Sequence, residues 1–295
     1  MRLPPLLIDF VFKFLFTTDR NSLNSLLSHI LYPDRSNSIE VIEILSSENS
    51  PSFQDAKNSF LDLKAKDKEG FLYQIELQVA EQVSYTKRSL YYASTLIHNQ
   101  LKAGESYFKI SPVIQINILD FPVFPNQGIV NWFLLKEKTN PTLVLTEDLQ
   151  MIYVELPKFH KDSIEELESG MDIWLFLLKN SQTLTEEDTL KLKQKLPDLQ
   201  NAFGVLELYA TDPEKQRQLE ERLRSDENFA YEMAAKYELG LARGLEQGIE
   251  QGIGQGEYRN KLETARKMLR ENDPIDKIIR ITGLSLVDLK KNGLV

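Results

Sequence analysis

The segment FLDLKAKDKEGFLYQIELQV, residues 60–79, decides how the chain folds. Polar and apolar side chains alternate on both sides of Gly70, and this period of two is typical of β-strands. If Asp67 pairs with Phe71, residues 68–70 form a three-residue hairpin loop in which glycine supplies a left-handed conformation. The segment therefore predicts two antiparallel strands joined by a tight turn.

The same register brings two acidic side chains together. Counting back from the turn pairs Asp62 with Glu76 and Lys64 with Gln74. Carboxylates directly opposite each other have β-carbons roughly 5 Å apart, which destabilises a strand pair unless something compensates. A divalent cation such as Mg²⁺ would compensate, because it prefers carboxylate, water and phosphate oxygens. A solvated hairpin face, or pairing with Lys64, is the alternative explanation.

The motif resembles the core of the PD-(D/E)XK nuclease superfamily, in which an aspartate on one strand precedes Glu-x-Lys or Glu-x-Gln on the next. Here it reads Asp62 and then Glu76-Leu77-Gln78. The surrounding sequence is similar to Rpn-type recombination-promoting nucleases and transposases, most strongly over residues 1–124. The supporting features are DFVFKFLF at 9–16, KRSLYY at 87–92, GESY at 104–107, a strand at 113–119 ending in Asp120-Phe121, and a glycine-periodic tail.

The resemblance implies an α/β (α+β) fold, a restriction-endonuclease-like mixed sheet flanked by helices, with a helical C-terminal region. It also implies a DNA endonuclease that uses Mg²⁺ or Mn²⁺. Asp62 and Glu76 would bind the metal together with the backbone carbonyl of Leu77. Gln78 would complete the catalytic set in the place of the usual lysine, but an amide cannot act as a cation.

Four further residues are candidate auxiliaries of this site. Asp9 would join the metal shell from the first helix, although Asp9 and Lys13 are four residues apart and could instead form a salt bridge. Lys13 or Lys64 would supply the charge that Gln78 lacks. Arg88 would contact phosphate, because guanidinium binds phosphate bidentately, or it is a surface cation without a task.

Composition limits the choice of function. Acidic residues outnumber basic ones, 44 to 35, which argues against a protein that simply coats nucleic acid. There is no cysteine and only three histidines, so thiolate zinc sites and cysteine nucleophiles are excluded. No apolar run reaches membrane-spanning length, and we expect a cytoplasmic protein without a membrane partner. The negative charge and Gln78 also suit a catalytically decayed nuclease fold that serves as a DNA-binding or protein-interaction scaffold.

Periodicity divides the chain into three predicted parts: a nuclease-like domain at 1–160, a helical accessory region at 161–237, and a tail at 238–295. Helices are predicted at 6–16, 23–31, 81–102, 163–179, 185–195 and 198–210, with another opened by Asp212-Pro213. Strands besides the hairpin are predicted at 39–44, 113–119, 130–135, 142–145 and 150–156. The helix at 81–102 should pack on the sheet through Val83, Leu90, Ile97 and Leu101.

Glycine recurs every four residues in the tail, from Gly240 to Gly256, beside a parallel row of leucine and isoleucine. Each glycine costs a helix about 1 kcal/mol relative to alanine. The segment is therefore either a helix for self-association or partner binding, or a flexible, partly helical linker. A small helical hairpin that turns at Thr282-Gly283 follows it.

Overall fold

The computed structural model describes residues 2–34, 37–45, 63–81 and 83–295. The chain forms two compact units, residues 1–216 and residues 217–295. The predicted division into three parts stays a prediction.

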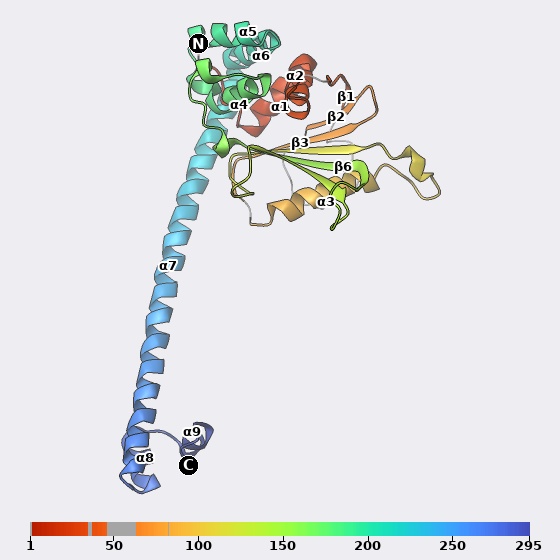
Figure 1. Ribbon diagram of the computed structural model, residues 1–295. Helices are drawn as coiled ribbons and strands as arrows, with labels where there is room; N and C mark the ends of the chain where they lie inside the picture. Colours follow the sequence, from red (N-terminus) through yellow and green to blue (C-terminus); the bar gives the residue numbers. More distant parts are fainter. Residues whose placement is uncertain (1, 35–36, 46–62, 82) are drawn as a thin grey trace. The chain divides into compact units, whose positions relative to one another are not determined.

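A mixed six-stranded sheet organises the first unit, in the order β1-β2-β3-β4-β6-β5 (Figure 1). The strands are β1 (Val41–Leu45), β2 (Leu63–Asp67), β3 (Leu72–Gln78), β4 (Val113–Leu119), β5 (Val130–Lys136) and β6 (Val144–Glu155). The pairs β1–β2, β2–β3 and β5–β6 are antiparallel, whereas β3–β4 and β4–β6 are parallel. Every residue of β4 is buried, as expected of a central strand covered on both faces. The mixed sheet predicted from the sequence is confirmed.

The hairpin between β2 and β3 has the predicted register. The amide of Asp67 donates to the carbonyl of Phe71 at 3.1 Å, and Gly70 has a φ of 93°. Lys64 pairs with Gln74, as counted from the turn. The buried carboxylate of Asp67 locks this turn, because it accepts hydrogen bonds from two amides of the loop and from the hydroxyl of Tyr73. Asp62 lies outside the described residues, so its pairing with Glu76 stays a prediction.

Helices cover both faces of the sheet (Figure 1). On one side lie α1 (Asp9–Thr18), α2 (Arg20–Leu31), α4 (Gly170–Asn180), α5 (Glu186–Lys195) and α6 (Leu199–Thr211). The other side is covered by α3 (Tyr85–His98). Short 3-10 turns lie at Tyr107–Lys109, Leu156–Lys158, Ile164–Glu166 and Ser181–Thr183.

Two predicted boundaries in this unit are wrong. The segment at 163–179 is not one helix. Ser169 is the N-cap of α4, which begins at Gly170, and its side chain accepts a hydrogen bond from the amide of Asp172. The strands predicted at 142–145 and 150–156 are one strand, β6. Its pairing with β5 jumps from Gln150 to Thr146, so the extra residues form a bulge in place of a break between two strands.

The contact face of α3 also differs from the prediction. Val83 lies before the helix and is fully exposed, and Leu90 is about half exposed. Tyr85, Ser89 and Ala93 form the buried face instead. The reason is chemical, because this face of the sheet carries polar side chains that need hydrogen-bond partners. The hydroxyl groups of Ser89 and Tyr153 lie 2.5 Å apart across this contact.

The second unit consists of most of α7 (Pro213–Arg270) followed by α8 (Ile275–Thr282) and α9 (Leu286–Lys291). As predicted, Asp212 caps α7. The glycine repeat, for which the sequence left a helix and a flexible linker open, is helical throughout. The predicted hairpin is confirmed, since Gly283 ends α8 with a φ of 68°. A small core holds it together: Ala265, Met268, Ile278, Leu284 and Leu289. Within the described residues, no helix is long and apolar enough to cross a membrane.

Two glycine substitutions should have opposite effects on the second unit. Gly248 is helical, and an added Cβ meets no atom within 4 Å, so Gly248→Ala should stabilise α7 by about 1 kcal/mol. Gly283 has equal space but a left-handed backbone, so Gly283→Ala should destabilise the hairpin by about 1 kcal/mol. Thermal melting followed by circular dichroism at low protein concentration measures both. Equal shifts of one sign would contradict the helical assignment of Gly248.

Candidate active site

Glu76 lies near the end of β3 and has an exposed fraction of only 1%. A buried carboxylate is costly unless hydrogen bonds and an opposite charge compensate it. Here one carboxylate oxygen accepts a hydrogen bond from the hydroxyl of Tyr85 at 2.9 Å. The other oxygen accepts from the guanidinium of Arg88 at 3.1 Å. Both partners come from the first turns of α3, which follows β3 in the chain.

Tyr85 joins the carboxylate to the neighbouring strand. Its hydroxyl lies 2.8 Å from the side-chain oxygen of Asn117 on β4, as well as 2.9 Å from Glu76. The hydroxyl carries one hydrogen and donates to one of these acceptors at a time. Burial, and next the negative charge of Glu76, raise the pKa of Tyr85 well above its usual range. Tyr85 therefore remains a protonated donor at any physiological pH.

Arg88 provides the compensating positive charge. Its guanidinium also lies over the rings of Tyr85 and Tyr92, at 5.9 and 5.5 Å from their centroids. Burial alone would lower the pKa of Arg88, but the adjacent Glu76 carboxylate outweighs it, and the net pKa is raised. About a quarter of the Arg88 side chain is exposed. The ion pair thus connects a buried acid to the surface.

Two more polar side chains complete this network. In the parallel register, Gln115 of β4 lies beside Gln74, and Asn117 lies beside Glu76. The side-chain amide of Gln115 donates to Asn117 at 3.2 Å and approaches Glu76 at 3.5 Å. Asn117 in turn donates to the backbone carbonyl of Ile152 at 3.0 Å. The side chains of Gln74, Glu76, Gln115 and Asn117 are therefore polar groups that are buried within the sheet.

Sequence reasoning missed Tyr85, Gln115 and Asn117. A signal was present for the two amides, because they stand two residues apart in the otherwise apolar strand VIQINIL. Side chains two apart in a strand share a face. Polar groups on a buried face imply a partner on the element that covers it. Nothing in the sequence alone identified Tyr85 as that partner.

The predicted site residues on the hairpin keep their expected places. Gln78 ends β3 on the same face as Glu76 and is partly exposed, and its backbone carbonyl accepts from the amide of Asp120 at 2.9 Å. The side chain of Leu77 is buried on the opposite face. Lys64 lies on β2 beside Gln74. Asp62 falls outside the described residues.

The remaining auxiliaries divide into two groups. Arg88 contacts Glu76 directly, so it is not a surface cation without a task. Asp9 and Lys13 lie on α1, on the side of the sheet opposite to α3 (Figure 1). The described geometry therefore does not bring them to the face that carries Glu76.

The chemistry of the donor set fits a cation at Glu76. A carboxylate is the hard oxygen ligand that Mg²⁺ and Mn²⁺ prefer. The carboxylate already forms an ion pair with Arg88, as a buried negative charge needs a neighbouring positive charge. The part of the chain that the structure describes holds no cluster of three metal-binding side chains. A complete centre would need the predicted second ligand, Asp62.

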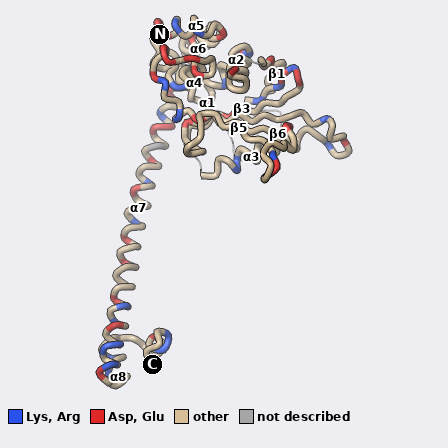
Figure 2. The backbone as a smooth tube through the Cα atoms, in the orientation of Figure 1, with Lys and Arg blue, Asp and Glu red and all other residues tan. Residues whose placement is uncertain are grey.

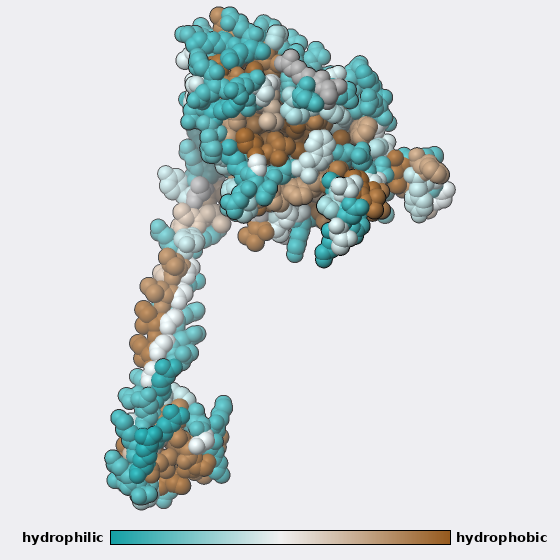
Figure 3. All heavy atoms as spheres, in the orientation of Figure 1, coloured by the Kyte–Doolittle hydropathy of each residue, from teal (hydrophilic) through white to brown (hydrophobic). Residues whose placement is uncertain are grey.

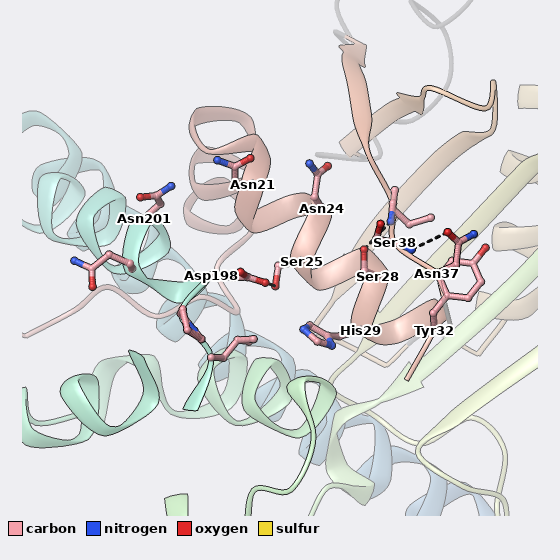
Figure 4. A pocket seen from close by; sticks show the side chains of 14 residues that line it. Asn21, Asn24, Ser25, Ser28, His29, Tyr32, Asn37, Ser38, Asp198 and Asn201 are labelled. Carbon is pink, nitrogen blue, oxygen red and sulfur yellow. Dashed lines mark hydrogen bonds between the residues drawn. The ribbon is translucent and has the colours of Figure 1, made fainter. Parts of the chain in front are cut away.

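A separate hollow of about 930 Å³ lies between α2 and the α5–α6 connection (Figure 4). Amide and hydroxyl side chains, among them Asn21, Asn24 and Asn201, form most of its wall. Asp198, a carboxylate in this wall, accepts a hydrogen bond from Ser25 at 2.9 Å. Among the residues that the structure describes, the lining contains no lysine or arginine, and none of the predicted site residues. Its chemistry does not suit a phosphate backbone.

Comparison with known protein families identifies the family of this chain. The family model for the PD-(D/E)XK nuclease family transposase matches residues 6–234. This range contains all six strands of the sheet and the helices α1 to α6. No curated protein and no solved structure matches the chain.

Removing the Tyr85 hydroxyl should weaken the fold around Glu76. Tyr85→Phe removes the hydroxyl that donates to one oxygen of the buried Glu76 carboxylate, while Arg88 still donates to the other oxygen and Gln115 to Asn117, so the free energy of unfolding should fall by about 1–3 kcal/mol. Chemical denaturation measures the change. Tyr91→Phe is the matched control, because Tyr91 lies on the same helix with 64% of its surface exposed. Equal stability of the two variants would show that the hydroxyl does not support the carboxylate.

Proposed function

Because this chain belongs to the PD-(D/E)XK nuclease family of transposases, we propose that it is a metal-dependent DNA endonuclease of the Rpn type. One observation carries the proposal: the hairpin has the register predicted for the nuclease motif, and its glutamate is buried with a cation against it. A buried, charge-balanced carboxylate in the middle of a sheet is costly to keep and is typical of functional sites. Cleavage would take place in the cytoplasm, where the chain meets DNA.

In this proposal Asp62 and Glu76 bind Mg²⁺ or Mn²⁺ with the backbone carbonyl of Leu77. The ion, when bound, activates a water molecule and offsets negative charge on the scissile phosphate. Gln78 orients the water or a phosphate oxygen, because an amide offers hydrogen bonds without a charge. Tyr85, whose hydroxyl also lies against Asn117, holds one oxygen of the Glu76 carboxylate in place.

Positive charge for DNA binding is concentrated in the C-terminal part of the second unit. Figure 2 shows lysine and arginine gathered at the end of α7 and on α8. Over residues 259–295, nine basic residues face five acidic ones, although the whole chain carries a net charge of −9. Phosphate binding depends on such local excess. This distribution supports DNA as the partner.

A decayed nuclease fold that serves as a DNA-binding or protein-interaction scaffold is the second candidate. It is favoured by Gln78, which lacks the usual charge, and by Arg88, which already neutralises Glu76. Titration with Mn²⁺ in the presence of a DNA duplex that resists cleavage separates the two candidates, because an active site binds the ion and a scaffold need not.

We also propose that the chain pairs with a second copy through α7. The proposed contact, here called the glycine–leucine face, consists of Gly240, Gly244, Gly248, Gly252, Gly256, Leu241, Leu245, Ile249 and Ile253. Each of its four large side chains is more than half exposed, and the two rows lie side by side along α7 (Figure 3). Such a long exposed helix lacks the packing that normally stabilises helices.

The pattern of this face fits a copy of itself. Successive residues are about 100° apart around a helix, so the glycine row and the apolar row form two adjacent edges. A two-fold axis parallel to the helices places the apolar row of one copy against the glycine row of the other. An antiparallel pair would instead place glycine against glycine. The face carries no charged residue, so neither DNA nor an acidic or basic peptide is its natural occupant.

The metal-site assignment is tested by plasmid nicking with and without Mg²⁺. Glu76→Gln keeps the size of the side chain but removes its charge and replaces one acceptor oxygen with an amide donor, and Asp62→Ala removes the second ligand. Each should reduce cleavage by at least about 100-fold, and Gln78→Ala by roughly 10- to 1000-fold, with the fold retained by circular dichroism. Glu81→Gln, at an exposed neighbouring position, is the control. If Glu76→Gln or Asp62→Ala cleaves as fast as the wild type, the assignment of the metal site is wrong.

Pairing through α7 is tested by cysteine crosslinking. The chain has no cysteine of its own, so only the introduced cysteine can react. Leu241→Cys and Ile253→Cys lie at opposite ends of the apolar row. In a parallel pair each single variant should link to its own copy through a short bis-maleimide. Gln251→Cys on the opposite side of the helix should not. A chain that ends at Tyr237 should remain folded and be monomeric by light scattering. Failure of both end positions to crosslink would rule out parallel pairing.

A further inference from the structure

We infer that Arg88 is a built-in counter-cation of Glu76 that competes with the metal until DNA phosphate draws it away. The inference rests on the proposed function and specifies how its site is controlled. Arg88 then couples the binding of metal to the binding of substrate, and the affinity of Glu76 for metal is lower in the absence of DNA.

The first step of the argument is competition for one carboxylate. Glu76 is 1% exposed, and its two oxygens are occupied by Arg88 at 3.1 Å and Tyr85 at 2.9 Å. A divalent ion would have to approach one of these oxygens to about 2.1 Å. Two cations against one buried carboxylate repel each other strongly in a medium that screens poorly. Tyr85 is neutral and can stay, so Arg88 is the group that must leave.

The second step is that Arg88 has somewhere to go. About a quarter of its side chain is exposed, whereas its partner is buried, so the guanidinium lies at the boundary between the network and solvent. It rests on the rings of Tyr85 and Tyr92, which can guide a movement outward without losing contact. Guanidinium matches the geometry of phosphate oxygens as well as that of a carboxylate.

The third step is thermodynamic. If phosphate binds Arg88 in its outward position and metal binds Glu76 once Arg88 has left, each ligand favours the same state of the protein. The two affinities must then increase each other by the same factor. Removing the charge of Arg88 should free Glu76 in advance and abolish this coupling.

Substitutions of Arg88 test the inference through binding rather than cleavage. Mn²⁺ affinity is measured by calorimetry at pH 8 without DNA. Arg88→Gln should bind Mn²⁺ about tenfold more tightly than the wild type, in line with typical coupling energies. Arg88→Lys keeps the charge and should resemble the wild type. Lys87→Gln is the matched control, because it removes an exposed cation from the same helical turn.

The reciprocal arm measures DNA affinity with and without Mn²⁺, by fluorescence anisotropy of a labelled phosphorothioate duplex that resists cleavage. Mn²⁺ should strengthen DNA binding about tenfold in the wild type and in Lys87→Gln, and much less in Arg88→Gln. If the wild type binds Mn²⁺ and Arg88→Gln binds it no more tightly, the inference is wrong while the proposed nuclease survives. If no variant binds Mn²⁺ with or without DNA, the proposed function and the inference fall together.

Discussion

A negative charge buried in the middle of a sheet imposes conditions on everything that touches it. Glu76 is almost completely inaccessible, and it lies on a strand flanked on both sides by other strands. Leaving such a carboxylate unpaired would cost several kcal/mol, a large part of the stability of a typical domain. The surrounding structure meets this demand with one cation, one hydroxyl and an amide.

This demand explains features that are otherwise unexpected in a protein core. The strand β4 is completely buried, yet it carries Gln115 and Asn117 among its aliphatic residues. The helix α3 turns Tyr85 and Ser89 inward and leaves Leu90 exposed. An apolar face on α3 would have buried more hydrocarbon, but it would have left the polar side chains of the sheet without partners. Membership of a nuclease family gives this arrangement a purpose, since a carboxylate there is the proposed metal ligand.

The second unit follows different physics. Its hairpin has a small core of its own, but the four large side chains of the glycine–leucine face of α7 are each more than half exposed. Five glycines spaced four residues apart weaken a helix by several kcal/mol in total. A partner that fits between the rows would recover part of that cost. Weak intrinsic helicity and an exposed apolar row are therefore two consequences of one sequence pattern.

The sequence by itself determined the features that depend on neighbouring residues. The register of the β2–β3 hairpin follows from Asp67 and Gly70, the start of α7 from Asp212, and the end of α8 from Gly283. In each case a turn or cap is specified by the chemistry of a few adjacent residues, so pattern and spacing suffice. The same holds for the motif that placed Glu76 and Gln78 on one face of a strand.

Only the tertiary structure decided what surrounds Glu76. Its partners lie 9, 12 and 39 residues further along the chain, on a helix and on a strand whose roles no local pattern reveals. The face that α3 buries and the continuity of β6 through a bulge were likewise set by packing, against the expectation from hydrophobic periodicity. Periodicity records how much apolar surface a segment can bury. The three-dimensional fold alone determines which polar group must be neutralised, and therefore which face of each element turns inward.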